Sequence, residues 1–275
     1  MFALRSLYIR FYTLVAVMVS VFALMHLVQG HWQWLAPLLA WVPMPLLNLW
    51  RRFKTNAWYR DERERPVMTL TLLAVAMVLI TGEREAPLWC TLAGLFGLLL
   101  LLFVATAVPR GLREKQGNST LLAELEFSDA AGKPCRLRQS LPQGPVMALF
   151  VHSPSQVYGC MAVRELQQWL QQGHSPIPAS QIVVIFPGDI PAWVEPLKSL
   201  GVHCWQDSQG ASLATLGLWL RGGNVGFPGG PNAARPALAV LADDQQQPGL
   251  WQVADNLRMP PSLEVLQSKI DRLVK

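Results

Sequence analysis

Four long apolar runs fill the first 110 residues, and they constrain the fold more than any other feature of the chain. The first run, residues 11–29, contains no Asp, Glu, Lys or Arg. At about 1.5 Å per residue, a helix of that length spans roughly the 30 Å of hydrocarbon in a bilayer. The other three runs are residues 32–50, 66–81 and 88–108. The sequence therefore predicts a membrane region of four transmembrane helices over residues 1–110.

A signal peptide is the competing interpretation of the first run. The run is longer than the apolar core of a usual signal peptide, and no small-residue cleavage site precedes the next run at Trp32. The composition also favours a membrane protein, because 51% of the 275 residues are hydrophobic and only 15% are charged. We therefore expect the lipid bilayer to be a partner of this chain.

Lys and Arg are distributed very unequally between the two ends of the predicted helices. The richer side carries Arg5, Arg10, Arg51, Arg52, Lys54, Arg60, Arg63, Arg65, Arg110, Arg113 and Lys115. The other side carries only Arg84, between two glutamates. Because cytoplasmic ends are enriched in Lys and Arg, both termini and all residues after the fourth run are predicted to be cytoplasmic. These Lys and Arg residues beside the apolar runs explain the formal charge of +5, so we expect no nucleic-acid partner.

The predicted spans contain almost no ionisable side chains that could form a transport path. His26 lies near one end of the first span, where an interfacial position or an interhelical hydrogen bond explains it. Cys90 lies near the outer end of the fourth span and is expected to be a small packing residue. A quinone or a membrane protein partner between the helices stays open as an alternative.

From about residue 121, after a predicted linker at 111–120, the composition becomes that of a soluble α/β domain. Two short strands joined by a turn at 129–133 come first. The further strands predicted by apolar runs are 146–152, 182–186, 202–205, 237–241 and 250–253. The predicted helices are 160–172, 190–200, 211–216 and 262–274. This alternation predicts a central mixed sheet with helices on both faces.

Cys160 carries the most specific chemical prediction. It begins a predicted helix, after a buried strand and a polar loop. Unpaired N–H groups and the positive end of the helix dipole favour a thiolate at such a position. A thioredoxin-type dithiol is absent, because Val157 stands three residues before Cys160. The alternative is a small buried cysteine that only packs.

The order of these segments resembles that of thioredoxin-fold redoxins. The helix start GCMAVRELQQWLQQ is followed by VVIFPGDIPAWVEPLKSLGV, then DSQGASLATLGLW, then RPALAVLADD. Together these segments are similar to the AhpC/TSA peroxiredoxins of the bacterioferritin-comigratory type, over residues 121–275. The resemblance implies a thioredoxin-like fold and a thiol-dependent peroxidase or thiol oxidoreductase that acts on a peroxide or a protein thiol. It implies no metal and no organic cofactor.

The resemblance also implies roles for individual residues. Cys160 matches the peroxidatic cysteine, whose thiolate attacks the O–O bond and becomes a sulfenic acid. Arg235 matches the arginine that lowers the thiol pKa. Pro236 falls where thioredoxin folds place a proline beside the active cysteine. The active-site loop implied by the match contains Ser153, Pro154, Ser155 and Gly159.

The loop departs from the family pattern P-x-x-x-T/S-x-x-C at two positions. Ser153 stands where the family has proline, and Val157 stands where it has a hydroxyl residue. Ser153 or Ser155 would have to supply the hydroxyl that contacts the peroxide. Pro154 only approximates the position of the family proline.

A sulfenic acid at this site needs a second thiol for its reduction. The candidates are Cys204, Cys135, a second protomer and an external thiol, although both cysteines are also typical packing residues. His152 and Tyr158 flank the site and are candidate proton donors, and the alternative for His152 is a packing role. No structural disulfide is expected in the reducing cytoplasm.

The whole sequence predicts a multi-pass protein of a bacterial inner membrane that carries a cytoplasmic redoxin domain. The alternative is a non-catalytic membrane interaction or assembly protein that uses the redoxin fold as a scaffold. The Gly-rich segment 221–234 lacks the lysine and the context of a phosphate loop, and we interpret it as a flexible lid near Arg235.

Overall fold

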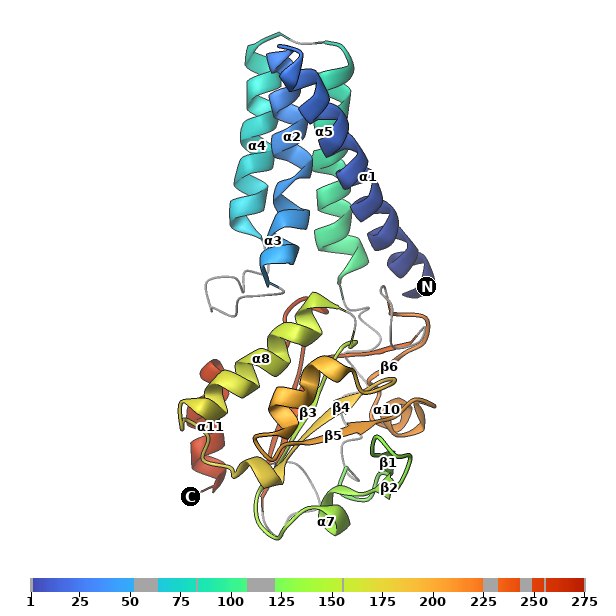
Figure 1. Cartoon of the computed structure of the whole chain (residues 1–275), viewed down its shortest axis with the longest axis vertical. Coiled ribbons are helices and arrows are strands. Elements are labelled where there is room, and N and C mark those ends of the chain that lie inside the picture. The colour runs from blue at the N-terminus through green and yellow to red at the C-terminus, as the bar shows by residue number, and fades with distance from the viewer. Residues whose placement is uncertain are drawn as a thin grey trace. The chain divides into compact units, whose positions relative to one another are not determined.

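A computed structural model describes residues 2–51, 64–82, 84–107, 122–154, 156–224, 232–242, 249–254 and 256–274. The chain divides into two compact units, one of residues 3–107 and one that begins at residue 108 (Figure 1). The predicted linker at 111–120 and the predicted boundary at 110 lie outside the described residues, so they stay predictions.

The first unit is entirely helical in its described parts. Its elements are α1 (Phe2–Val28), η1 (Trp32–Trp34), α2 (Leu35–Trp41), α3 (Pro43–Arg51), α4 (Arg65–Ile80), α5 (Ala86–Leu100) and the π-helical turn η3 (Leu101–Ala105). The predicted second span is divided into shorter helices. α2 ends just before Pro43, because proline has no N–H and its ring clashes with a preceding helical turn.

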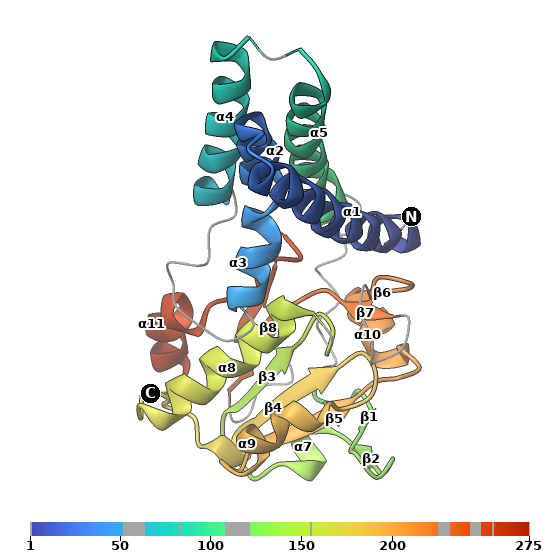
Figure 2. The ribbon, with the colours of Figure 1, turned by 45° about the horizontal axis from the view of Figure 1, so that its top comes forward.

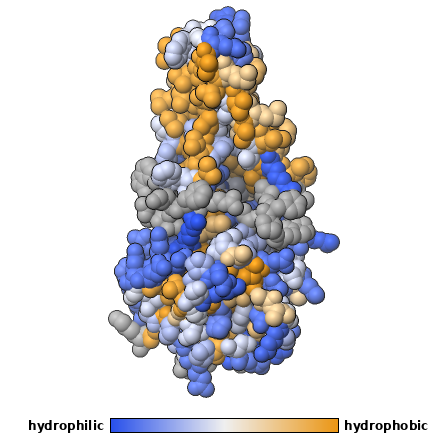
Figure 3. Space-filling model, in the orientation of Figure 1, coloured by the Kyte–Doolittle hydropathy of each residue, from blue (hydrophilic) through white to orange (hydrophobic). Residues whose placement is uncertain are grey.

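Two helices of this unit are long and apolar enough to cross a membrane, namely Leu4–Val28 and Ala86–Ala105. α4 is apolar but has only 16 residues. Large apolar side chains cover much of the exposed surface of the helical unit, which is uncommon for a protein that meets only water (Figure 3). Four transmembrane helices, and the direction in which they cross, therefore stay predictions.

A glycine and a side-chain hydrogen bond hold α5 against α2. A Cβ added at Gly94 would lie 2.9 Å from the nearest side-chain atom of α2, so the close approach of these helices requires glycine. The Trp41 Nε1–H donates a hydrogen bond of 2.9 Å to the carbonyl oxygen of Cys90. At the end of α1, the His26 ring stacks on the Trp34 ring with centroids 4.7 Å apart. The His26 ring thus contributes to helix packing, whereas Cys90 contributes its backbone carbonyl, and a packing role of its side chain stays a prediction.

A buried ion pair joins the end of α3 to the start of α4. Arg51 donates two hydrogen bonds, of 2.7 and 2.8 Å, to the two carboxylate oxygens of Glu64. The two side chains are 2% and 1% exposed. Glu64 also has a φ of 49°, a left-handed conformation that is strained for a residue with a Cβ. Most of the charged segment RDERER, residues 60–65, lies outside the described residues.

The second unit contains a seven-stranded sheet among its described residues, in the order β2-β1-β5-β4-β3-β8-β9. The strands are β1 (Phe127–Ser128), β2 (Pro134–Cys135), β3 (Val146–Phe150), β4 (Ile182–Phe186), β5 (His203–Gln206), β8 (Ala237–Leu241) and β9 (Leu250–Val253). β3, β4 and β5 are parallel, whereas β8 and β9 are antiparallel to their neighbours (Figure 2). The predicted mixed central sheet is confirmed.

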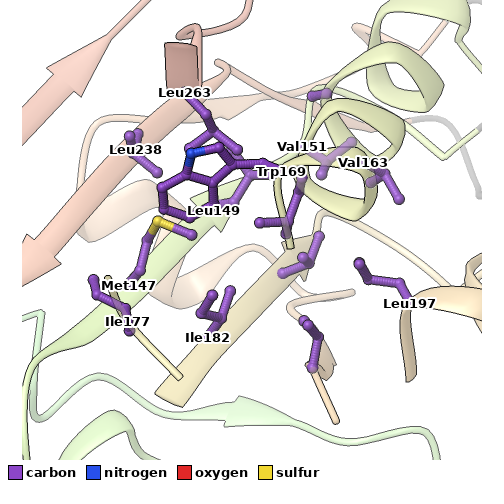
Figure 4. Close-up of a cluster of buried hydrophobic side chains, with 14 of the residues drawn as sticks. Met147, Leu149, Val151, Val163, Trp169, Ile177, Ile182, Leu197, Leu238 and Leu263 are labelled. Atoms are coloured by element: carbon purple, nitrogen blue, oxygen red, sulfur yellow. The ribbon is translucent and has the colours of Figure 1, made fainter. Parts of the chain in front are cut away.

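Helices cover both faces of this sheet, as predicted. The helices on one face are α8 (Val157–Gln171), α9 (Glu195–Lys198) and α11 (Leu263–Val274). The helices on the other are α7 (Leu137–Ser140) and α10 (Ala211–Thr215). Successive residues of a strand point to opposite faces, so Met147 and Leu149 pack beneath Trp169 of α8, while Ala148 and Phe150 face the other way (Figure 4).

Three local predictions differ from the structure. The second of the two predicted N-terminal strands was expected within residues 131–141, but residues 137–140 form a helical turn. The predicted helix 190–200 is shorter and consists of the turn η7 (Ala192–Val194) and α9. Pro196 sets the start of α9, because a helix tolerates proline only in its first turn. A small sheet of β6 (Trp219–Leu220) and β7 (Ala233–Ala234) was not predicted, and it flanks the Gly-rich segment.

Candidate active site

Cys160 lies in the first turn of α8. The helix begins at Val157, three residues earlier than the sequence predicts, and Gln156 precedes it with an extended backbone. The backbone N–H of Cys160 donates to the carbonyl oxygen of Gln156 at 3.2 Å, which opens the hydrogen-bond ladder of the helix. The cysteine is 6% exposed. Its sulfur therefore sits in the part of the helix where the dipole favours negative charge.

The loop before α8 begins at the end of β3. β3, β4 and β5 run parallel, so their C-terminal ends meet at one edge of the sheet. Ligands and catalytic groups in parallel α/β sheets gather at that edge. The Cys160 loop, of which residues 151–154 and 156 are described, emerges there.

Gly159 brings the start of α8 into direct contact with this loop. A Cβ at Gly159 would overlap with the carbonyl oxygen of Ser153 and would lie 2.8 Å from Cγ1 of Val151. Only a residue without a side chain permits this approach. The turn that carries Cys160 therefore rests directly on residues 151–153.

His152 connects the same segment to β7. Its backbone carbonyl accepts a hydrogen bond of 2.8 Å from the N–H of Ala234, and its Nδ1 lies 2.5 Å from the carbonyl oxygen of Ala234. A carbonyl oxygen only accepts, so Nδ1 carries the proton. Burial lowers the pKa of His152 to about 4, so the imidazole is neutral near pH 7.

Arg235 and Pro236 follow this contact and directly precede β8. Because β8 pairs antiparallel with β3, they run alongside the segment that contains His152. The Arg235 Nε–H donates 2.8 Å to the carbonyl oxygen of Ala254, and the Ala254 N–H donates 2.8 Å to the carbonyl oxygen of Pro236. Arg235 is 1% exposed. Gly159 and Ala234, the residues directly before Cys160 and Arg235, thus both contact the segment 151–153.

The other predicted loop residues take part in contacts within the fold. The buried Ser153 Oγ–H donates a hydrogen bond of 2.6 Å to Oδ1 of Asn224. The carbonyl oxygen of Pro154 accepts a hydrogen bond of 3.2 Å from Nε1 of Trp193. Ser155 lies outside the described residues. The sequence contains no pattern that links Asn224 or Trp193 to the loop.

The two candidate resolving cysteines lie on opposite faces of the sheet. Cys204, in β5, belongs to the core beneath α8, and Cys135, in β2, belongs to the core on the other side. Burial raises the pKa of Cys204 to about 11 and also raises that of Cys135. None of the four cysteines is in a disulfide. Their role as resolving thiols stays a prediction.

The described residues contain no group of three or more His, Cys, Asp or Glu side chains placed to hold a metal ion. The arrangement brings together one thiol in the first turn of a helix with a buried cation and a neutral imidazole on adjoining backbone.

Sheet order and strand direction define a thioredoxin-like α/β domain, and Cys160 lies in α8, the helix that follows the first parallel strand. No family model and no curated protein matches the chain. Solved structures similar to it include the peroxidoxin BcpB from Mycobacterium tuberculosis, with 15% identity, a TM-score of 0.40, and coverage of 56% of this chain and 96% of that chain.

Two further similar structures are also peroxiredoxins. Reduced Prx3 from Vibrio vulnificus has 13% identity and a TM-score of 0.42, and the match covers 55% of this chain and 96% of that one. Peroxiredoxin Q from Xanthomonas campestris has 9% identity and a TM-score of 0.40, and the match covers 56% and 94%. Because the identities and TM-scores of these matches are low, the function of this chain is inferred from its own residues and contacts.

Proposed function

We propose that the chain is a membrane-anchored redoxin, a thiol-dependent peroxidase or thiol oxidoreductase in which Cys160 is the single catalytic thiol. The position of Cys160 carries this proposal. It lies in the first turn of α8, at the C-terminal edge of the parallel strands, on a loop segment that adjoins the buried Arg235. Both the helix terminus and the cation favour the thiolate form.

The proposed reaction uses the Cys160 thiolate of the chain, a hydroperoxide and two external thiols. The Cys160 thiolate attacks one oxygen of a hydroperoxide, an S–O bond forms, and the O–O bond breaks. The other oxygen leaves with a proton as water or an alcohol, and the cysteine is oxidised by two electrons to a sulfenic acid. An external thiol then attacks the sulfur and releases water. A second thiol displaces the first, which restores Cys160 and leaves the reductant as a disulfide.

A protein thiol is the alternative substrate of the same site. In that case the oxidised cysteine transfers its two oxidising equivalents to a dithiol, which leaves as a disulfide. In both cases the oxidised state of Cys160 is the sulfenic acid formed from a hydroperoxide, and its formation requires a thiolate at Cys160.

We propose further that the helical unit anchors this domain in a bacterial inner membrane by four helices, with both termini and the redoxin domain in the cytoplasm. The two long apolar helices, the apolar surface of the unit and the bias of Lys and Arg support this arrangement. A second membrane protein that contacts the helices is part of the proposal.

Two observations favour the non-catalytic alternative, in which the fold is a scaffold for membrane assembly. Val157 brings no hydroxyl group to the start of α8. The hydroxyl proton of Ser153 is donated to Asn224. Neither side chain therefore offers the hydrogen bond that would hold a peroxide oxygen beside Cys160.

Peroxide consumption by the purified full chain in detergent decides between these functions. Hydrogen peroxide and cumene hydroperoxide are supplied with dithiothreitol, and the variants are Cys160→Ser and, as a matched control, Cys204→Ser. The enzyme proposal requires consumption by the wild type and the control but not by Cys160→Ser. No consumption of either peroxide by the wild type supports the scaffold.

A further inference from the structure

We infer that His152 and Ser153 are positioning residues that tie the Cys160 loop to the β6–β7 hairpin and so fix the thiol relative to Arg235. The inference rests on the proposed function, because it assigns a role toward a reactive Cys160. It concerns the two positions directly after Val151, where the chain has His-Ser.

The first tie is the pair of hydrogen bonds between His152 and Ala234. The backbone bond resembles the next rung of a strand ladder, and the side-chain bond of 2.5 Å adds a second contact between the same two residues. The next residue after Ala234 is Arg235. The side chain of His152 thus fixes the backbone of Ala234, the residue directly before the buried Arg235.

The second tie ends on the same hairpin. Ser153 donates to Asn224, which lies just beyond β6, and Ala234 lies in β7. β6 and β7 pair with each other through Trp219 and Ala234. Two consecutive side chains of the loop are therefore anchored to one small sheet.

The ties are positional and carry no net charge near pH 7. Burial keeps His152 neutral, and Ser153 and Asn224 are neutral residues. The buried positive charge directly beside this contact is that of Arg235, whereas Arg221 after β6 is exposed. His152 therefore influences the thiol through geometry alone.

A displacement of residues 151–153 should also displace Cys160. Because Gly159 rests on Ser153 and Val151, a shift of this segment moves the first turn of α8. The attraction between a thiolate and a guanidinium weakens with distance, so release of a tie should lower the fraction of thiolate.

Alkylation of Cys160 by iodoacetamide measures the thiolate fraction without any peroxide. The full chain in detergent is treated over a range of pH, and the peptide that contains Cys160 is quantified by mass spectrometry. His152→Phe keeps an aromatic ring but loses the donor, whereas the side-chain amide of His152→Asn replaces the Nδ1–H donor. Ser153→Ala removes the second tie. His174→Phe, at the exposed far end of α8, is the matched control.

We expect His152→Phe to slow alkylation at pH 6 by about tenfold, since one unit of thiol pKa changes the thiolate fraction tenfold at a pH below it. Ser153→Ala should slow alkylation severalfold. His152→Asn should keep most of the wild-type rate, and the control His174→Phe should react at the wild-type rate. Equal rates in His152→Phe, Ser153→Ala and the wild type would overturn the inference.

Two measurements keep the outcomes distinct. Cys204, whose pKa burial raises to about 11, must stay unmodified in each folded variant. If Cys204 becomes alkylated in the His152→Phe variant, the fold of that variant is disturbed, and Ser153→Ala alone tests the inference. Arg235→Gln tests the underlying function: if it leaves the alkylation profile of Cys160 at the wild-type value, the proposed cation is wrong. If Arg235→Gln shifts the profile and the tie variants do not, only the inference fails.

Discussion

The backbone of Gly159 lies directly against the carbonyl oxygen of Ser153, so closely that no side chain fits between them. This contact seats the cysteine-bearing turn of α8 on its own loop. A substitution at Gly159 must therefore displace either the helix start or the loop, and the geometry of the candidate site with it.

Gly159→Ala is expected to destabilise the redoxin domain by about 1–3 kcal/mol, the usual cost of overpacking, and to slow the reaction of Cys160 with peroxide. Gly173→Ala is the matched control. It has open space around it but a φ of 68°, so its cost is backbone strain alone, remote from Cys160. Stopped-flow oxidation and thermal unfolding separate the two effects. Equal oxidation rates in the two variants would contradict the assigned contact.

His152 predicts a pH dependence of stability. Its pKa is about 4 in the folded protein and 6.5 as the ordinary value, so only the unfolded chain takes up a proton as pH falls through this interval. As the pH falls below about 6.5, the free energy of unfolding should decrease by up to about 1.4 kcal/mol per pH unit. The decrease due to His152 ends at about pH 4, where the folded protein also takes up the proton.

The His152→Asn variant should have a flatter curve over the same interval. The measurement is a urea titration of the full chain with a pulse of dipyridyl disulfide, which labels Cys204 only after the redoxin domain unfolds. Identical pH profiles for the variant and the wild type would show that His152 is not neutral and buried in the folded protein.

The Arg51–Glu64 pair predicts strong coupling in the helical unit. Arg51→Met or Glu64→Gln leaves one buried group without its partner and should cost about 3–5 kcal/mol, whereas replacing both by Met should cost much less than the sum. Loss of helical circular dichroism during thermal unfolding in detergent reports this unit, which is helical in its described parts. Additive costs in the double variant would show that the two side chains do not interact.

The proposed topology predicts the activity of reporter fusions. Alkaline phosphatase is active only outside the cytoplasm, so a fusion after residue 118 should be inactive and a fusion after residue 84 should be active. The second fusion is the internal control for expression and export. An active fusion after residue 118 would reverse the orientation.

Apolar strands were the most predictable part of the fold. β4, β8 and β9 have the bounds that the sequence indicates, because each is a short, largely apolar run with a proline or an aspartate within two residues of its end. The helix after Cys160 was also predicted, although its start at Val157 was not, because Val157 and Tyr158 precede the glycine that looks like a helix boundary.

The contacts that organise the candidate site could not be predicted from the sequence. His152 and Ala234 are 82 residues apart, and Ser153 and Asn224 are 71 apart. Local periodicity contains no information about such pairs. The two-residue strands β6 and β7, which carry these partners, are also too short to produce a strand pattern. The cysteine was therefore visible in the sequence, but the groups that position it were not.

The most direct measurement of the central claim is the trapping of a sulfenic acid on Cys160. The reduced full chain in detergent is exposed to one equivalent of hydrogen peroxide in the presence of dimedone, and the modified peptides are identified by mass spectrometry. We predict a dimedone adduct on Cys160 and none on Cys204 or Cys135, whose pKa values burial raises. An unmodified Cys160 under these conditions would contradict the proposal that this chain acts through its thiolate.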